Sequence, residues 1–328
     1  MIVKPVVIIG GPTASGKSAL AVDVALAFGG TVVNADSMQL YRELDVLTAR
    51  PGAEDLERAP HRLYGVLPGS ERGSAARWRA MALDEIAAAH GAGRVPVVVG
   101  GTGLYLRALM EGLSAVPTVP EEVRRAAHAR LEALGGEAFR AELVARDPAM
   151  ARLNPGDTTR LTRAWEVLEA TGRPLSEWQA ERAEGPPPGL SFHVVILEPP
   201  RAALYERCDR RFVLMLEQGA LEEVRRLDAL GLDPGLPVMK ALGVPELRAH
   251  LHGAMPLDEA VAKGQQSTRN YAKRQGTWFR HQLAGRQPPS PGSSLAAGAV
   301  HGCHAVPALY TENVRDAILR ALDKTVRT

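Results

Sequence analysis

Residues 11–18 form the pattern Gly-x-x-x-x-Gly-Lys-Ser, which is the phosphate-binding loop, or P-loop. Its glycines let the backbone curl so that successive N–H groups point at one anion. Lys17 adds a cation for the outer phosphates, and the hydroxyl of Ser18 is suited to Mg²⁺. The pattern predicts a site for a di- or triphosphate, with these binding residues: Gly11, Thr13, Ala14, Ser15, Gly16, Lys17 and Ser18.

Asp36 is a candidate for acid–base chemistry because it follows the predicted strand 31–34. In an open α/β sheet, ligands bind at the carboxyl ends of the strands. A carboxylate there can bind Mg²⁺, hold a substrate hydroxyl or accept a proton. Asp36 can equally form a turn that caps the next helix, so the residue type leaves both interpretations open.

The predicted strand 95–99 ends in Gly100-Gly101-Thr102-Gly103 and not in an acid. Motor and switch ATPases need a carboxylate at that place for their metal-bound water, so its absence counts against those classes. The glycines predict a close approach of the backbone to a ligand, and Thr102 offers a hydroxyl at the strand end.

Two groups of cations lie in the second half of the chain. Arg207 and Arg211 are four positions apart on the predicted helix 201–218, so they share a face and could clamp a pyrophosphate. The alternative is a pair of solvated arginines bound to Glu206 or Asp209. The segment 267–280 interleaves cations with aromatic residues, which suits either a nucleic-acid surface or a helix whose aromatic residues lie in the core.

The elements that must position these residues alternate between strand and helix. Apolar strands at 6–9, 31–34 and 95–99 and helices at 19–28 and 77–90 predict an α/β fold with a P-loop NTPase-like parallel sheet flanked by helices. From 121 to 182 the pattern is helical, and the strand 192–197 returns to the sheet. Further helices are expected at 201–218, 221–230, 257–281 and 311–324.

We therefore expect a catalytic core and an all-helical insertion. The expected boundaries are 1–114 plus 191–284 for the core, 115–190 for the insertion, 285–308 for a linker rich in Pro, Gly and Ser, and 309–328 for a C-terminal helix.

The composition bears on the charge, the cysteine chemistry and the cellular location of the protein. The net charge of +2 gives no general positive field, and the two cysteines show neither metal-ligand spacing nor a disulfide pattern. No apolar run approaches the ~18 residues of a membrane span, and the first strand begins without a preceding signal peptide. We expect a cytoplasmic protein that does not associate with membranes and is a monomer.

Taken together, the motifs resemble the tRNA dimethylallyltransferase family, also called tRNA isopentenyltransferase, over about residues 6–282. The resemblance rests on seven segments: 11–18, Asp36-Ser-Met-Gln-Leu-Tyr41, Thr48-Ala-Arg-Pro51, Pro60-His-Arg-Leu63, Val99-Gly-Gly-Thr-Gly-Leu-Tyr105, Arg160-Leu-Thr-Arg-Ala-Trp-Glu-Val167 and Ala272-Lys-Arg-Gln-Gly-Thr-Trp-Phe-Arg280. The chain departs from the family pattern at Gly243-Val244-Pro245.

The resemblance implies transfer of the dimethylallyl group from dimethylallyl diphosphate to N6 of the adenosine on the 3′ side of the anticodon, with release of pyrophosphate. It makes Asp36 the general base and Thr102 its partner at the adenine. The P-loop, Arg207 and Arg211 would then hold the prenyl diphosphate, with Mg²⁺ at Ser18.

The resemblance also implies contacts with the anticodon stem-loop of tRNA. The residues concerned are Ser37, Met38, Gln39, Arg124, Thr159, Arg160, Leu161, Thr162, Arg163, Lys240 and Gly243. The basic segment adds four candidates: Arg269, Lys273, Arg274 and Arg280. A small-molecule kinase and a nucleotide-gated RNA-binding module are the alternative functions that the P-loop allows.

Overall fold

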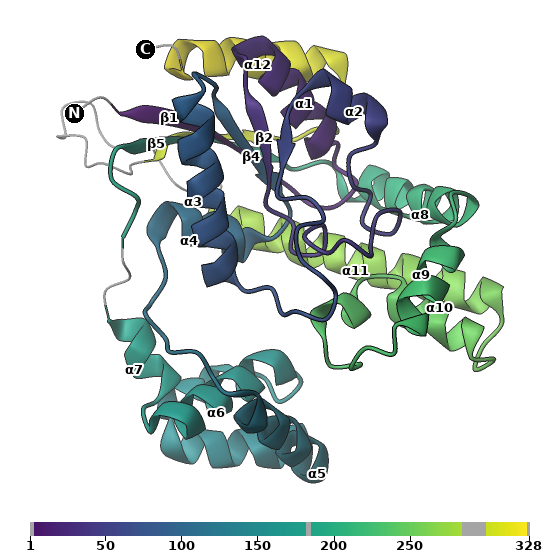
Figure 1. Ribbon diagram of the computed structural model, residues 1–328. Helices are drawn as coiled ribbons and strands as arrows, with labels where there is room; N and C mark the ends of the chain where they lie inside the picture. Colours follow the sequence, from purple (N-terminus) through teal and green to yellow (C-terminus); the bar gives the residue numbers. More distant parts are fainter. Residues whose placement is uncertain (1–2, 182–184, 284–299, 327–328) are drawn as a thin grey trace. The chain divides into compact units, whose positions relative to one another are not determined.

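The computed structural model describes residues 3–181, 185–283 and 300–326 (Figure 1). The chain divides into two compact units. The first unit consists of Met1–Met110 and Pro186–Thr328, and the second of Glu111–Gly185.

The first unit contains a parallel sheet of six strands in the order β3-β2-β4-β1-β5-β6. The strands are β1 (Lys4–Gly10), β2 (Thr31–Asn34), β3 (His61–Arg62), β4 (Pro96–Gly100), β5 (Leu190–Leu197) and β6 (Val300–Val306). Gly10 at the end of β1 lies opposite Gly100 of β4 and Ile196 of β5. The parallel α/β fold predicted from the sequence is confirmed.

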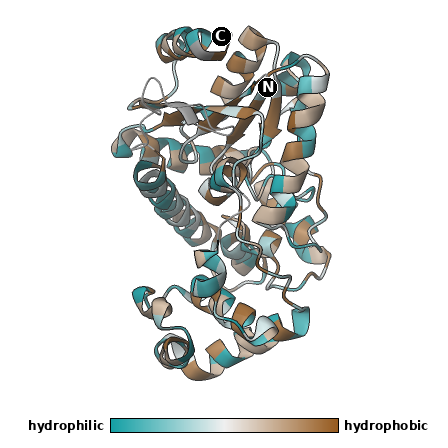
Figure 2. Cartoon of the chain, turned by 90° about the vertical axis from the view of Figure 1, so that its left-hand side faces the viewer, coloured by the Kyte–Doolittle hydropathy of each residue, from teal (hydrophilic) through white to brown (hydrophobic). Residues whose placement is uncertain are grey.

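Apolar residues fill the inner strands because both faces of the sheet are covered. Val6 and Ile8 lie in the core on one face, whereas Val7 and Ile9 lie in the core on the other. This alternation follows from the two-residue period of a strand. Figure 2 shows the hydrophobic colour concentrated on these strands.

Helices of the first unit pack on the two faces. α1 (Lys17–Phe28) and α12 (Glu312–Val326) share one core, and α3 (Ala75–Gly91) and α4 (Gly103–Glu111) contribute to the other. The remaining helices are α2 (Ala53–Arg58), α8 (Arg201–Glu217), α9 (Ala220–Ala229), α10 (Val244–Leu251) and α11 (Leu257–Gln282), with a 3₁₀ turn at Pro237–Lys240.

The segment predicted as a linker, 285–308, requires a correction. Residues 284–299 lie outside the described residues, but Val300–Val306 form β6, which pairs in parallel with β5. Its sequence, Val-His-Gly-Cys-His-Ala-Val, lacks the long apolar run of the inner strands. An edge strand needs fewer apolar residues than an inner strand, so the composition of the segment misled the prediction.

The second unit is helical and has a core of its own. Its elements are α5 (Glu121–Arg146), a 3₁₀ turn (Pro148–Arg152), α6 (Thr158–Thr171) and α7 (Leu175–Ala180). Phe139, Leu143, Leu161 and Val167 are fully buried in this core. α5 is interrupted at Gly135, whose φ of 72° is left-handed, so the chain forms two helical stretches on either side of that residue.

No helix within the described ranges has the length and apolar character that crossing a membrane requires.

Candidate active site

Three neighbouring strands end where the predicted site residues begin. β2, β4 and β1 are adjacent in the sheet, and they lead into Asp36, into Gly101-Thr102 and into the P-loop. Because the strands are parallel, all three segments leave the same edge. The sheet order therefore brings together residues that are far apart in the sequence.

The P-loop has the backbone geometry of an anion site. Gly11, Ala14 and Gly16 have positive φ values of 154°, 63° and 92°. Gly16 is the N-cap of α1 and provides no side-chain cap, so the first-turn N–H groups are left for an external acceptor. Among the described residues, no partner reaches the buried Oγ of Ser15.

Three cations converge beside this loop. Burial lowers the pKa of Lys17 to about 8. The attraction of Asp36 opposes this shift, and the repulsion of Arg211 adds to it. Burial also lowers the pKa of Arg211, and the charge of Arg207 adds to that effect. The guanidinium of Arg211 donates to Oγ1 of Thr13, whereas Nη1 of Arg207 is buried with no partner in the described part of the chain. Like charges held together in this way favour a bound anion.

Asp36 forms a turn, which is one of the two roles that the sequence allows. Its Oδ1 accepts a hydrogen bond from the N–H of Met38 at 3.0 Å, which is a turn contact. Its own N–H donates to Oδ1 of Asn34 at 2.8 Å. Within the described residues no hydrogen-bond donor reaches Oδ2, so only one of the two carboxylate oxygens is held by the turn.

Thr102 lies directly against the turn that carries Asp36. Oγ1 of Thr102 accepts from the N–H of Ser37 at 3.0 Å and donates to Oγ of Ser37 at 3.3 Å. The glycines before it permit a close approach to protein and not to a ligand. A Cβ on Gly100 would lie 2.1 Å from the carbonyl oxygen of Ala35.

Two residues of α11 complete the site, and the sequence interpretation missed both. Oε1 of Gln275 accepts from the N–H of Thr13 at 2.8 Å, and its Nε2 donates to the carbonyl of Gly101 at 2.9 Å. The hydroxyl of Tyr271 interacts with the side chains of Thr102 and Gln275. Gln275 thus joins the P-loop to the end of β4. A buried glutamine on the apolar stripe of a helix was the available signal.

The predicted tRNA contacts in the first unit differ in exposure. Ser37, Met38 and Gln39 are half-buried, and Nε2 of Gln39 donates to the carbonyls of Thr48 and Ala49 at 2.9 and 3.0 Å. Gly243 is buried at the N-cap of α10 with a φ of 88°, whereas Lys240 is exposed.

The cations of α11 separate into two kinds. Arg269 is bound to Asp209. Lys273, Arg274 and Arg280 are exposed, and the Arg274 guanidinium lies 5.7 Å from the centre of the Tyr271 ring. The exposed three are the ones whose charge is available to a partner.

In the second unit, the helical phase of α6 separates the predicted tRNA residues. Thr159 and Arg160 are exposed, and Arg163 is half-buried. Leu161 is fully buried in the core and Thr162 is 3% exposed, so the structure does not bring their side chains to the surface. Arg124 of α5 is half-buried and pairs with Glu121 at 4.0 Å.

The described residues contain no group of three or more His, Cys, Asp or Glu side chains that would form a metal cage. Ser18 is exposed at the first turn of α1. This arrangement fits Mg²⁺, which is commonly held by one or two protein groups together with substrate phosphates.

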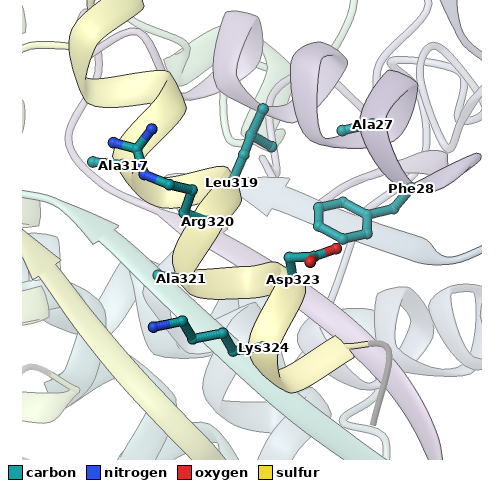
Figure 3. Close-up of a pocket in the computed structure, with 8 residues that line it drawn as sticks. All are labelled: Ala27, Phe28, Ala317, Leu319, Arg320, Ala321, Asp323 and Lys324. Atoms are coloured by element: carbon teal, nitrogen blue, oxygen red, sulfur yellow. The ribbon is translucent and has the colours of Figure 1, made fainter.

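A cavity of about 620 Å³ lies elsewhere in the first unit, between α1 and α12 (Figure 3). Ala27 and Phe28 line it from α1. Those residues end the helix that Lys17 begins, and 12 residues of α-helix span about 18 Å. The cavity is therefore separate from the phosphate site.

The chain is similar in sequence to known transferases. The family model described as IPP transferase matches residues 39–282, and the model described as isopentenyl transferase matches residues 4–69. A tRNA dimethylallyltransferase of Rhodospirillum centenum is 66% identical over 298 residues, which cover 90% of this chain and 95% of that protein.

Solved structures show the same fold. The full-length tRNA isopentenylpyrophosphate transferase of Bacillus halodurans superposes with a TM-score of 0.67 at 29% identity and covers 99% of this chain and 97% of its own. A eukaryotic dimethylallyltransferase acting on tRNA gives a TM-score of 0.67 at 29% identity and covers 84% of this chain and 70% of its own.

Proposed function

The chain belongs to the tRNA dimethylallyltransferase family, and from this premise we propose how its own residues carry out the reaction. It transfers the dimethylallyl group of dimethylallyl diphosphate to the exocyclic amine of the adenosine on the 3′ side of the tRNA anticodon. The products are the prenylated tRNA and pyrophosphate. The observation that carries the proposal is the hydrogen bond from Arg211 to Thr13 in the P-loop that holds Lys17, with Asp36 near both cations.

The diphosphate binds to the P-loop through the first-turn N–H groups of α1 and the three cations. As the bond between the allylic carbon and the diphosphate oxygen breaks, negative charge grows on the leaving group. Fixed donors and cations stabilise that charge without reorganising, and stabilisation of this type is usually the largest single contribution to enzymatic rate enhancement. The buried, unpartnered Nη1 of Arg207 fits this role.

Asp36 accepts the proton of the amine as the new C–N bond forms. The amine of adenine is a weak nucleophile, so removing its proton during attack lowers the barrier. Oδ2 is the oxygen for this step, because Oδ1 is held by the N–H of Met38. Thr102 is a positioning residue, since its bonds to Ser37 fix the turn that presents Asp36.

Mg²⁺ is the expected cofactor, with Ser18 as its protein ligand. When bound, the ion supplies positive charge to the diphosphate. The residues proposed here to meet tRNA are exposed or half-buried, and they leave out Gln39 and Arg269, whose side chains are bound within the first unit. They are Ser37, Met38, Arg124, Thr159, Arg160, Arg163, Lys240, Lys273, Arg274 and Arg280. A cytoplasmic location follows from the tRNA substrate, and a monomeric state remains a prediction.

A turnover experiment tests the function. The chain is incubated with tRNA and dimethylallyl diphosphate labelled in the prenyl group, and separately with ATP and candidate hydroxyl substrates. We expect label in tRNA, one pyrophosphate released for each label, and no label in a matched tRNA with guanosine at the target position. Phosphorylation from ATP without prenyl transfer would identify a kinase. Binding of tRNA without turnover of either donor would identify a binding module.

A further inference from the structure

The C-terminal segment reaches the phosphate site, although it lies outside the residues that the family models match. Those matches end at residue 282. The N–H of Tyr310 donates to the carbonyl oxygen of Ser15 in the P-loop at 3.3 Å. A Cβ on Gly16 would lie 2.6 Å from the Cβ of Tyr310, so the two backbones are in direct contact. This glycine is required by the segment as well as by its φ of 92°.

The side chain of Tyr310 anchors the same contact to α1. Its hydroxyl donates to Oδ2 of Asp23, whose Oδ1 is bound by Arg58 at 3.0 Å. Asp23 lies in the second turn of α1, so the anchor lies on the helix that begins in the P-loop. Tyr310 therefore binds the P-loop through its own backbone N–H and binds α1 through its own side chain.

Elements on either side of Tyr310 hold the segment in place. β6 precedes it and pairs with β5. α12 follows it and buries Ile318 and Leu322 in the core shared with Leu20 and Val24 of α1. The segment is thus part of the packed first unit at the point where it meets the P-loop.

The peptide geometry shows what this contact does. The C=O of Ser15 and the N–H of Gly16 belong to one planar trans peptide, so they point in opposite directions. With Ser15 O held by Tyr310, the Gly16 N–H is directed to the other side of the loop. We propose that Tyr310 is a positioning residue, which orients the Ser15–Gly16 peptide so that the Gly16 N–H serves as a diphosphate donor. This inference rests on the proposed function, which places the prenyl diphosphate in the loop.

Full-length variants separate the two contacts. Tyr310→Pro removes the backbone donor, and Tyr310→Phe removes only the hydroxyl bond to Asp23. Ile318→Val is the matched control, because it loosens the packing of α12 without changing Tyr310. The affinity for inorganic pyrophosphate is measured by calorimetry, together with KM for dimethylallyl diphosphate, kcat, tRNA affinity and the thermal unfolding midpoint.

Loss of a neutral hydrogen bond changes an equilibrium by about threefold to tenfold. We expect Tyr310→Pro to weaken pyrophosphate binding by about that factor, with a matching rise in KM for dimethylallyl diphosphate and unchanged tRNA affinity. Tyr310→Phe should show a smaller loss, about twofold to threefold, and it keeps the test open if the proline variant does not fold. Ile318→Val should lower the unfolding midpoint only.

Equal pyrophosphate affinity in wild type and Tyr310→Phe would overturn the inference, and so would equal losses in Tyr310→Phe and Ile318→Val. The proposed function has a separate readout, which is prenyl transfer by the wild type. Weaker pyrophosphate binding in the variants of a chain that transfers no prenyl group would support the positioning role and refute the function. Absence of pyrophosphate binding by the wild type would overturn both.

Discussion

The two units hold their charged side chains in opposite ways. In the first unit, the site is fixed by contacts between distant parts of the chain, such as the bond from Thr13 to Gln275 across 262 positions. In the second unit, the arginines expected at tRNA are paired with acids three positions away. Arg160 lies 3.3 Å from Asp157, and Arg163 lies 3.4 Å from Glu166.

This difference indicates that the reaction takes place in the first unit. Removing one group from a buried, preorganised site causes a large loss of rate or affinity, because no other group replaces the lost interaction. Pairs of neighbouring charges on a helix surface are worth only about 0.3–0.5 kcal/mol, so an arginine exchanges its carboxylate for an RNA phosphate at little cost. Variants of the buried site in the first unit should therefore change rate or diphosphate affinity, and variants of these arginines in the second unit should change only tRNA affinity.

Asp36→Asn should give the largest effect. The amide keeps the shape and the turn acceptor but cannot take the proton, and loss of a general base typically lowers kcat by about 10²–10⁴-fold. Asp233→Asn is the matched control, because Oδ1 of Asp233 accepts from the N–H of Gly235 in the same kind of turn. A fall of less than about tenfold in kcat for Asp36→Asn would show that Asp36 only forms the turn and is not the general base.

Arg211→Ala and Arg207→Ala should act on the prenyl diphosphate. Loss of a charge-assisted contact to phosphate costs about 1.5–3 kcal/mol, or roughly tenfold to a hundredfold in KM. Arg210→Ala on the same helix is the control, since Arg210 is exposed and bound to Glu206. If the tRNA affinity fell and KM for dimethylallyl diphosphate did not change, this face of α8 would belong to RNA.

The pH dependence of pyrophosphate binding should reveal Lys17. Its pKa is lowered to about 8, so the ammonium is charged at pH 7 and loses its proton as the pH rises through 8. Affinity should then fall by up to about tenfold per pH unit above that value, because only the cation attracts the anion. Lys17→Met removes this dependence and corrects for the ionisation of pyrophosphate itself. Parallel pH profiles for the two proteins would contradict the assignment.

The second unit should show the smallest effect. Replacing Arg160 and Arg163 together by Gln should lower the slope of log affinity for tRNA against log salt concentration by about one to two units. Arg130→Gln, which breaks an exposed pair with Glu142 in the same unit, is the control and should leave the slope unchanged. An unchanged slope in the double variant would mean that tRNA binds elsewhere.

Local signals were enough to predict the P-loop and the sheet. An apolar run followed by glycines at fixed spacing specifies both the strand and the anion site, and Asp36 and Thr102 follow from the rule that ligands bind at strand ends. The same reasoning predicts that Arg207 and Arg211 share one face of a helix, and in the structure Arg211 donates to Thr13 of the P-loop.

Contacts across long sequence separations escaped prediction. Nothing near Gln275 indicates that its amide will join Thr13 to Gly101, because that depends on how α11 packs. The same holds for Tyr310 and for β6, whose sequence is not strongly apolar. Leu161 and Thr162 were placed at tRNA as part of a continuous motif, whereas the period of α6 turns both inward.

The most direct test is the single-turnover rate of prenyl transfer at saturating tRNA and dimethylallyl diphosphate. We predict that the Arg160→Gln, Arg163→Gln double variant reaches the wild-type rate once tRNA saturates, because its defect is one of binding. Asp36→Asn should remain slower than wild type by about 10²-fold or more at any tRNA concentration. The account would be contradicted by a wild-type rate in Asp36→Asn, or by a double variant that stays slow when tRNA is saturating.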